Sequence, residues 1–545
     1  MGLGTWIDNN DVLISFGNDE LWYEDAMATG TMLQLAASVG DVDTSDNLTC
    51  TNAFGRAVIL NGSNLKVFDP SSTKITTANV GSHPPDPFTK LTGETSEAVM
   101  YVVYITSLSG ACTIYGIKET SNENTFESGE TVTGLDDDGN AISFVLNANE
   151  VTPKIDIDGG HWYDFGVFGN DSSYGELPAA AYLGAMYLGR LYIAGDPDSP
   201  YGWYASAQRN IHNWLYDQED VASAVRGGDT DVGDLQDIPR ALVPYGNSYL
   251  LFGCASSMYV MINDPHQGGT LVKVSRDIGM FGARSWCHDE NGNLYFLGTG
   301  GIYRLSPDLQ QLDHLTELVL PRFIKTEGID PSTHRVCMEW DKMRHGFEMS
   351  IVDLSDGTNS CYWYDSITQG LFPESYQPTT STYSMLYYDA STAAHKGMLM
   401  GGGDGYIRVH DDSETDDDLG PTTIAVDSYV TLGPFKMGKN MGDEGIFQYI
   451  HGILAGGETN GSQSDSNNVT WYVYVGKSPE EVMENVAVDN YVTSGILKGP
   501  GYVKGNKSLR RVRGRFCAIR LRNNSASQTW GFEELEVSIE PVGRL

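Results

Sequence analysis

Short runs of apolar residues, separated by turns rich in Gly, Asn and Ser, recur along most of this chain. The pattern is clearest in two places, where residues 250–252 (LLF) lead to 258–260 (MYV) and residues 294–296 (LYF) lead to 302–304 (IYR). Runs this short, rich in aromatic residues and bounded by turn residues, predict antiparallel hairpin strands rather than helices. Few stretches show a helical period, so the chain is predicted to be all-β.

The hairpins recur at a regular interval. Tyr259 and Tyr303 lie 44 residues apart, and Leu21 and Leu65 are separated by the same interval. A unit of four strands that recurs about every 40–50 residues is typical of a β-propeller blade. Seven candidate hairpins follow this pattern, and we therefore expect a ring of six to eight blades; they lie at residues 11–24, 56–69, 185–207, 241–264, 283–308, 347–364 and 397–410.

Two segments interrupt the period. Three prolines fall within residues 82–87 (SHPPDP), and proline is disfavoured inside paired strands. Several short strands with acidic turns follow, which predicts an inserted β domain. After the acidic run at 411–418 the strands become longer, as in WYVYV at 471–475. We therefore expect four parts: the first propeller blades at residues 1–81, the inserted domain at 82–175, the remaining blades at 176–418, and a C-terminal β-sandwich at 419–545 that closes or decorates the propeller.

Local patterns in the C-terminal part support the sandwich. Leu535, Val537 and Ile539 alternate with polar residues, which predicts a strand with one buried face. Ser478, with proline next and Glu481 three residues later, has the form of a helix N-terminal cap.

The charge is strongly acidic, with 72 Asp and Glu against 34 Lys and Arg and a net charge of −38. This balance argues against a protein that binds nucleic acid through a basic surface. One basic strip departs from it, and period-two spacing predicts that Arg511, Arg513 and Arg515 share a strand face. The strip either contacts phosphate or the acidic surface of another copy, or is a solvated face that balances nearby acids. Its members are Lys504, Lys507, Arg510, Arg511, Arg513, Arg515, Arg520 and Arg522.

The sequence contains no recognisable catalytic, cofactor-binding or metal-binding motif. G-x-S-x-G, H-E-x-x-H and G-x-G-x-x-G are missing, and the P-loop-like Gly476-Lys477-Ser478 has Trp471 where the first glycine is required. The aspartates at 136–138 and at 156 and 158 lack full calcium-loop spacing and are interpreted as tight turns. A Gly-containing loop that either is solvated or binds a cation carries Asp229, Asp231, Asp234 and Asp237. We therefore expect no catalytic residue, no cofactor and no bound metal.

The seven cysteines are scattered, odd in number and without C-x-x-C spacing. This argues against a disulfide framework and a structural zinc site, and favours folding in a reducing cytoplasm. No secretory signal is visible and no apolar run approaches the length of a membrane-spanning helix.

Several stretches together resemble the β-propeller tail nozzle or packaged-DNA stabilisation proteins of short-tailed bacteriophages. They are RLYIAGDPDSPYGWYASAQRNIHNW (190–214), IPRALVPYGNSYLLFGCASSMYVM (238–261), GGTLVKVSRDIGMFGARSW (268–286) and the ending FEELEVSIEPVGRL. The resemblance implies a virion structural protein without enzymatic activity, assembled in the host cytoplasm. It would form a homo-oligomeric ring of six copies that contacts portal, adaptor and other tail proteins and retains the packaged DNA.

The charge is compatible with this expectation, because a DNA channel benefits from walls that do not bind phosphate. We therefore expect acidic loops to line the channel, duplex DNA to pass without specific binding, and the 504–522 strip to lie away from it. Two alternatives stay open: a phage-tail propeller that binds receptors or glycans, and a propeller glycosidase with acidic residues in its central channel.

Overall fold

The structure is a computed structural model of the 545-residue chain. It divides into two compact units, residues 1–410 and 411–545. The residues that it describes are 2–4, 11–24, 31–44, 48–119, 121–153, 159–217, 219–229, 232–246, 248–374, 376, 380–390, 395–410, 416–418, 423–440, 442–455, 466–504 and 512–542.

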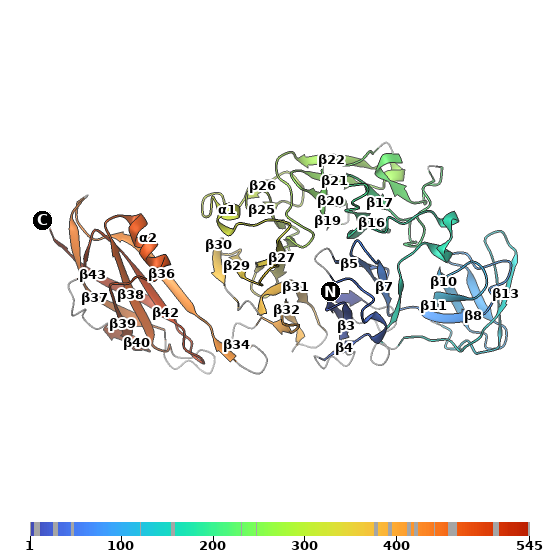
Figure 1. The fold of residues 1–545 in the computed structure, drawn as a ribbon, viewed down its shortest axis with the longest axis horizontal. Coiled ribbons are helices and arrows are strands. Elements are labelled where there is room, and N and C mark those ends of the chain that lie inside the picture. The colour runs from blue at the N-terminus through green and yellow to red at the C-terminus, as the bar shows by residue number, and fades with distance from the viewer. Residues whose placement is uncertain are drawn as a thin grey trace. The chain divides into compact units, whose positions relative to one another are not determined.

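The first unit is a β-propeller. Its described residues form seven radial sheets, here called blades 1–7, which follow one another around an axis (Figure 1). Blade 1 contains β1 (Gly2–Gly4), β2 (Asp11–Gly17), β3 (Glu20–Glu24) and β4 (Met32–Gln34). Blade 2 contains β5 (Thr49–Ala53), β6 (Arg56–Leu60), β7 (Lys66–Asp69) and β14 (His161–Asp164). Blade 3 contains β15 (Leu183–Tyr187), β16 (Arg190–Ala194), β17 (Trp203–Ala205) and β18 (Val225–Arg226).

Blades 4–7 continue the ring, and the short helix α1 (Phe323–Glu327) lies between blades 5 and 6 in sequence. Their strands are β19 (Pro239–Tyr245), β20 (Tyr249–Cys254), β21 (Met258–Ile262) and β22 (Thr270–Ser275); β23 (Trp286–His288), β24 (Leu294–Leu297), β25 (Ile302–Leu305) and β26 (Leu312–His314); β27 (His334–Asp341), β28 (Gly346–Asp353), β29 (Asn359–Asp365) and β30 (Gly370–Glu374); and β31 (Thr382–Tyr388), β32 (Gly397–Gly402) and β33 (Ile407–Val409).

The sheets confirm the propeller that the repeat predicts, and their number falls within the expected range. Each of the seven candidate hairpins supplies adjacent strands of a different blade. The two hairpins at 250–260 and 294–304 lie in successive blades rather than in one continuous sheet. The first strand of a blade packs beside the first strand of the next, and Thr51 Oγ1 of β5 donates a hydrogen bond of 2.8 Å to Gly184 O of β15.

Both faces of a blade are buried, which explains why the strand sequences are continuously apolar rather than alternating. In blade 4, Leu250 and Phe252 pack with Trp203 of blade 3, whereas Leu251, which points to the other face, packs with Phe296 of blade 5. Burial of such side chains contributes about 1.5–3 kcal/mol each. Every blade therefore depends on the two blades that flank it.

The ring closes between its first and last blades. Leu13 of β2 packs with Tyr388 and Leu399 of blade 7 in one buried cluster. The Tyr388 hydroxyl also donates a buried hydrogen bond of 2.5 Å to Glu24 Oε2 at the end of β3. Residues 364 positions apart in sequence are thereby joined.

A six-stranded sheet is inserted within blade 2. It contains β8 (Thr73–Thr77), β9 (Lys90–Gly93), β10 (Val99–Ile105), β11 (Cys112–Lys118), β12 (Thr131–Leu135) and β13 (Ala141–Val145). The insertion was expected, but the boundaries 82 and 175 are wrong. It follows β7 directly, and β14 completes blade 2 well before residue 175. The prolines at 84–87 lie between β8 and β9, inside the insertion, so they do not mark its start.

Aromatic side chains join the inserted sheet to blade 2. Tyr104 and Tyr115 of the inserted sheet stack on Tyr163 of β14, with ring centroids 5.1 and 4.4 Å apart. His212 also stacks on Tyr104, at 4.2 Å. Burial lowers the pKa of His212 to about 4, which keeps this residue a neutral part of the apolar contact.

The C-terminal unit is a β-sandwich with a short hairpin before it. The hairpin is β34 (Asp416–Asp418) and β35 (Thr423–Ala425), so the unit begins earlier than the predicted residue 419. One sheet has the order β36, β42, β38, β39, and the other joins β37 to β40, β41 and β43. These strands are β36 (Ser428–Lys436), β37 (Glu444–Leu454), β38 (Val469–Gly476), β39 (Thr493–Leu497), β40 (Gly501–Lys504), β41 (Val512–Gly514), β42 (Phe516–Asn523) and β43 (Phe532–Val542).

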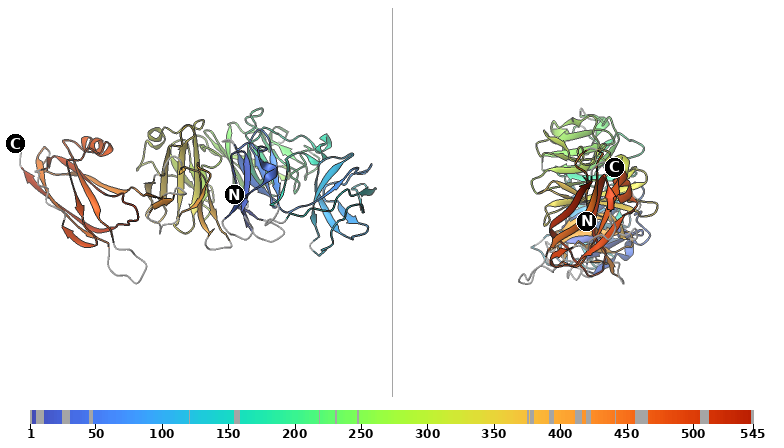
Figure 2. Two further views of the ribbon diagram at one scale, coloured as in Figure 1. Left: turned by 60° about the horizontal axis from the view of Figure 1, so that its bottom comes forward. Right: turned by 90° about the vertical axis from the view of Figure 1, so that its left-hand side faces the viewer.

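The predicted local features of the sandwich are present. Leu535, Val537 and Ile539 of β43 contribute to the core between the two sheets. Helix α2 (Pro479–Ala487) begins after Ser478, whose Oγ accepts a hydrogen bond of 3.2 Å from the Glu481 amide. The helix packs on the outer face of the sheet formed by β36, β42, β38 and β39 (Figure 2). Its contacts are made by Val482 and Val486.

A fully buried arginine ties blade 3 to blade 4. Arg190 of β16 donates through Nε to Asp264 Oδ2 at 2.7 Å. Its two terminal nitrogens donate to the carbonyl oxygens of Ser206 and Val221, at 3.0 and 2.7 Å. The side chains of Arg190 and Asp264 are 0% and 5% exposed, so the charge of each depends on the other.

We predict that Asp264→Asn lowers the free energy of unfolding of the propeller by about 3–5 kcal/mol, because it leaves the Arg190 charge buried without a counter-ion. The control is Asp313→Asn, which breaks a partly exposed pair with Arg304 and is expected to cost less than about 1 kcal/mol. Urea unfolding of both variants measures the difference. Equal losses would contradict the role assigned to the Arg190 pair.

Candidate functional site

The predicted basic strip is divided in the structure. Arg513 lies on β41 and forms an ion pair with Glu444 on the neighbouring strand β37. Arg515 lies at a bend between β41 and β42 and is exposed, as is Lys504 at the end of β40. The prediction that Arg513 and Arg515 share a strand face is wrong, because the chain crosses from one sheet of the sandwich to the other at Arg515. Lys507, Arg510 and Arg511 lie outside the described residues.

The remaining two members lie on β42, in the other sheet. Arg522 makes two hydrogen bonds to the carboxylate of Asp427, at 2.6 and 2.8 Å. Arg520 lies 3.4 Å from Asp489 and donates to the Val486 carbonyl near the end of α2, at 3.3 Å. Three of the five described members are thus held by acids of the same unit. This favours the interpretation of the strip as a face that balances nearby acids.

A cavity of about 360 Å³ lies at one end of the propeller axis. Its walls come from five blades, and they lie in or just before the first strands β5, β15, β19, β23 and β27, with Leu354 following β28. The lining residues are Leu48, Thr49, Tyr182, Arg240, Phe281, Gly282, Ala283, Arg284, Pro331, Ser332, His334, Arg335, Val336 and Leu354.

Three arginines from successive blades line this axial cavity, and none of the described residues that line it is acidic. Arg240, Arg284 and Arg335 are all half-buried. Arg284 donates from Nη2 to Leu48 O at 2.7 Å, which holds its side chain across the start of blade 2. The Arg335 guanidinium lies over the Tyr383 ring, 5.6 Å from its centroid.

The charges of two of these arginines reach the same buried thiol. Burial raises the pKa of Cys337 to about 12, and the positive charges of Arg284 and Arg335 oppose that rise. Cys337 lies on β27, beside the cavity wall. Sequence analysis did not identify the arginines as a group, because they lie 44 and 51 residues apart. The signal in the sequence that could have grouped these arginines is that each of them lies at the start of a predicted blade.

A second group of ionisable residues lies between blades 6 and 7. Glu348 in β28 is fully buried, and neither of its carboxylate oxygens has a hydrogen-bond partner in the described part of the chain. Its neighbour Ser350, on the same face of the sheet, donates to Thr382 O of β31 at 2.9 Å. Burial raises the pKa of Glu348 well above its ordinary value, and the Glu374 charge raises it further. Burial also raises the pKa of Glu339, its cross-strand partner, to about 7.

The aspartate-rich segments act as turns where they are described. Asp136 accepts a hydrogen bond from the Asn140 side chain at 2.9 Å, and Asp237 accepts from the hydroxyls of Ser256 and Ser257, both at 2.9 Å. Asp156, Asp158 and Asp231 lie outside the described residues. Within the described ranges, no group of three or more His, Cys, Asp or Glu side chains is arranged to hold a metal ion.

The cysteines form no disulfide, and six of the seven are buried. Among the described helices, none is long and apolar enough to cross a membrane.

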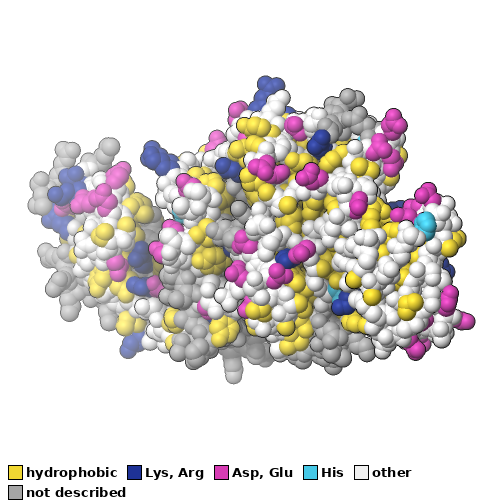
Figure 3. All heavy atoms as spheres, turned by 45° about the vertical axis from the view of Figure 1, so that its right-hand side comes forward, with side chains coloured by type: hydrophobic (Ala, Val, Ile, Leu, Met, Phe, Trp, Pro, Cys, Tyr) yellow, Lys and Arg dark blue, Asp and Glu magenta, His cyan; other side chains and the backbone are white. Residues whose placement is uncertain are grey.

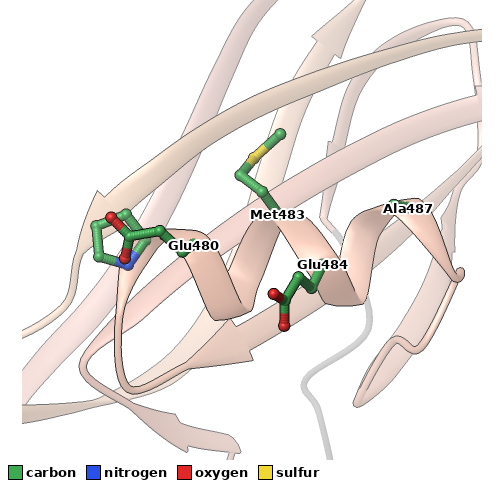
Figure 4. Close-up of a pocket in the computed structure, with 5 residues that line it drawn as sticks. Glu480, Met483, Glu484 and Ala487 are labelled. Atoms are coloured by element: carbon green, nitrogen blue, oxygen red, sulfur yellow. The ribbon is translucent and has the colours of Figure 1, made fainter. Parts of the chain in front are cut away.

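A shallow depression on the sandwich is lined only by helix α2. Its residues are Pro479, Glu480, Met483, Glu484 and Ala487, which lie along the outward side of the helix (Figure 4). Because no second element contributes a wall, this surface lacks the convergent polar groups of a ligand site. The axial cavity is therefore the better candidate binding site.

No protein-family model and no curated protein matches the chain. Three solved structures share a distant similarity. YCF48 from Cyanidioschyzon merolae matches with a TM-score of 0.28 and 10% identity, over 61% of this chain and 97% of that one. TolB from Acinetobacter baumannii gives 0.24 and 10%, over 75% and 80%. An auxiliary nutrient binding protein from Bacteroides ovatus gives 0.24 and 11%, over 89% and 99%. Similarities this low carry no argument about function.

We predict that Glu348 makes the stability of the propeller fall as the pH rises. Its pKa is higher in the folded than in the unfolded chain, so the folded state holds the proton more tightly, and stability is lost as the pH rises above the ordinary value of 4.5. Glu348→Gln is expected to be the more stable protein at about pH 8 by more than about 1.4 kcal/mol, the free energy of one unit of pKa shift, because the glutamine neither ionises nor has to hold a proton against the pH.

The same advantage should shrink or disappear at about pH 3, below the ordinary value of 4.5, where the wild-type carboxyl is protonated in both states. Urea unfolding at both pH values measures it. Glu290→Gln, which changes an exposed residue of blade 5, is the control and should follow the wild type. A Glu348→Gln variant with unchanged pH dependence would contradict the assignment.

Proposed function

We propose that this chain is a structural subunit of a bacteriophage tail, a nozzle or head-to-tail connector that forms a ring of six copies. In this role it retains packaged DNA and forms the channel through which the DNA leaves. It acts by shape and charge, without catalysis, and contacts portal, adaptor and other tail proteins in the virion.

The proposal is carried by the sequence stretches that resemble tail nozzle proteins. Three of them form a contiguous part of the propeller: residues 190–214 contain β16 and β17, 238–261 contain β19 and β20 and most of β21, and 268–286 contain β22 and the connection to β23. The fourth is β43 of the sandwich. The resemblance thus follows two strands of blade 3, the four strands of blade 4 and the connection to blade 5, rather than a single hairpin of the kind on which unrelated propellers converge.

The distribution of charge also supports a wall that does not hold DNA. Many of the described cations are paired within the chain, as Arg56 is with Asp69 and Lys66 is with Asp164. Asp and Glu side chains lie over many parts of the surface, as Figure 3 shows for one face. Because non-specific DNA binding arises from cations that neutralise phosphates, such a surface binds duplex DNA weakly.

A propeller that binds a receptor or glycan is the second candidate, and the axial cavity favours it, since ligand sites are concave. A glycosidase would place acidic residues in the central channel, whereas the lining of the described cavity is basic.

We predict that the purified chain, alone or mixed with the portal and adaptor proteins of its virion, gives a complex with six times the mass of the single chain. Native mass spectrometry measures this directly. Strictly monomeric protein under both conditions would exclude the ring and favour a soluble binding propeller.

We also predict that the chain fails to retain duplex DNA in an electrophoretic shift assay, and that the double variant Asp427→Asn, Asp489→Asn gains measurable affinity. These substitutions remove the acids that hold Arg520 and Arg522 and expose two cations to phosphate. The gain should be lost as salt is raised, because binding releases counterions.

The control is Asp138→Asn, Glu290→Gln, which removes the same charge at exposed turns. If the control gains equal affinity, net charge alone sets the behaviour. If the wild type binds DNA tightly, the proposed inert wall is wrong.

A further inference from the structure

We propose that the axial cavity of the propeller binds a phosphorylated small molecule, with its phosphate group held by Arg240, Arg284 and Arg335. This inference concerns a single chain and does not rest on ring formation or on any role in a virion. It starts from an imbalance of charge. The chain has about two acids for each cation, yet the part of this cavity's lining that the structure describes holds three arginines and no acid.

The arginines come from a rigid frame. Arg240 begins its blade within β19, Arg335 lies at the start of β27, and Arg284 lies two residues before β23. The carbonyl of Arg284 accepts a hydrogen bond of 2.9 Å from the Met338 amide of β27, which fixes blade 5 to blade 6 beside the cavity. Guanidinium groups held in this way favour oxyanions, because each presents a planar fork of donors that matches two oxygens.

The three arginine side chains differ in the contacts that they make within the protein. Arg284 donates to Leu48 O, and Arg335 lies over Tyr383. Arg240 makes no hydrogen bond or ion pair within the described residues. Its charge acts on Asp330, whose pKa is lowered by hydrogen bonds from Ser332 and, less strongly, by His334 and Arg240. Asp330 is thus engaged with Ser332, at 2.6 Å, and Arg240 remains available to a ligand.

The remaining walls indicate what is attached to the phosphate. Tyr182, Phe281, Val336 and Leu354 provide aromatic and aliphatic surface around the arginines. The volume of about 360 Å³ lies near the lower end of the range for small-molecule sites, roughly 300–1,000 Å³, and is far larger than an inorganic phosphate requires. A doubly charged phosphate monoester with a small organic group therefore fits three cations and an apolar wall better than a carboxylate does.

The test is isothermal titration of the full-length chain with phenyl phosphate, inorganic phosphate and benzoate at constant ionic strength. We expect saturable binding of phenyl phosphate, weaker binding of inorganic phosphate, and none of benzoate. Arg240→Gln should weaken phenyl phosphate binding about tenfold or more, the loss of a charge-assisted hydrogen bond. Arg515→Gln removes an exposed arginine of the sandwich and should bind like the wild type.

Arg240→Lys and thermal unfolding of each variant without ligand separate binding from folding. The lysine variant keeps the charge but not the planar fork, and it should bind with intermediate affinity. No saturable binding of any of the three probes would overturn the proposal. So would an equal loss in Arg240→Gln and Arg515→Gln, or binding of benzoate as tight as that of phenyl phosphate.

Discussion

The requirement that each blade bury both of its faces governs the first unit of this protein. Leu250 and Leu251 are neighbours in sequence, yet they pack against different blades. A blade at the end of an open row would leave one such face in water, at a cost of about 25 cal/mol for each Å² of apolar surface. The contact of Leu13 with Leu399, and the bond from Tyr388 to Glu24, remove that open end. Closure of the ring is thus a condition for the stability of every sheet within it.

The closed ring also explains how distant residues meet at the axial cavity. Because every first strand runs along the axis, residues at the starts of different blades converge at one end of it. Arg240, Arg284 and Arg335 lie at or just before the start of the first strand in three successive blades. A repeat that is needed only for packing therefore brings together side chains that are far apart in sequence. These three residues are not members of the buried apolar clusters that form the blade cores.

The fold was predictable from the sequence to the extent that it is periodic. The seven hairpins, the Ser478 cap and the alternation in β43 are local patterns, and each is present in the structure. The errors fall where tertiary structure decides. The prolines at 84–87 end no blade, because the chain had already left blade 2 after β7. The crossing between sheets at Arg515 has no local signal, and it divided a strip that spacing alone had treated as continuous. The arginine cavity required knowledge of where each blade begins.

In both units of the protein, arginine side chains are paired with acidic side chains. Arg56 and Arg190 are buried with Asp69 and Asp264, and Arg522 is held by Asp427 at the surface. Each such pair stabilises the chain locally but contributes no net charge to its surroundings. The remaining acids then determine the field outside the molecule, which repels polyanions at long range. A small anion experiences a different field inside the axial cavity, whose described lining holds three arginines and no acid. Both proposals rest on this difference, the exclusion of a large polyanion from the surface and the binding of a small one at the axis.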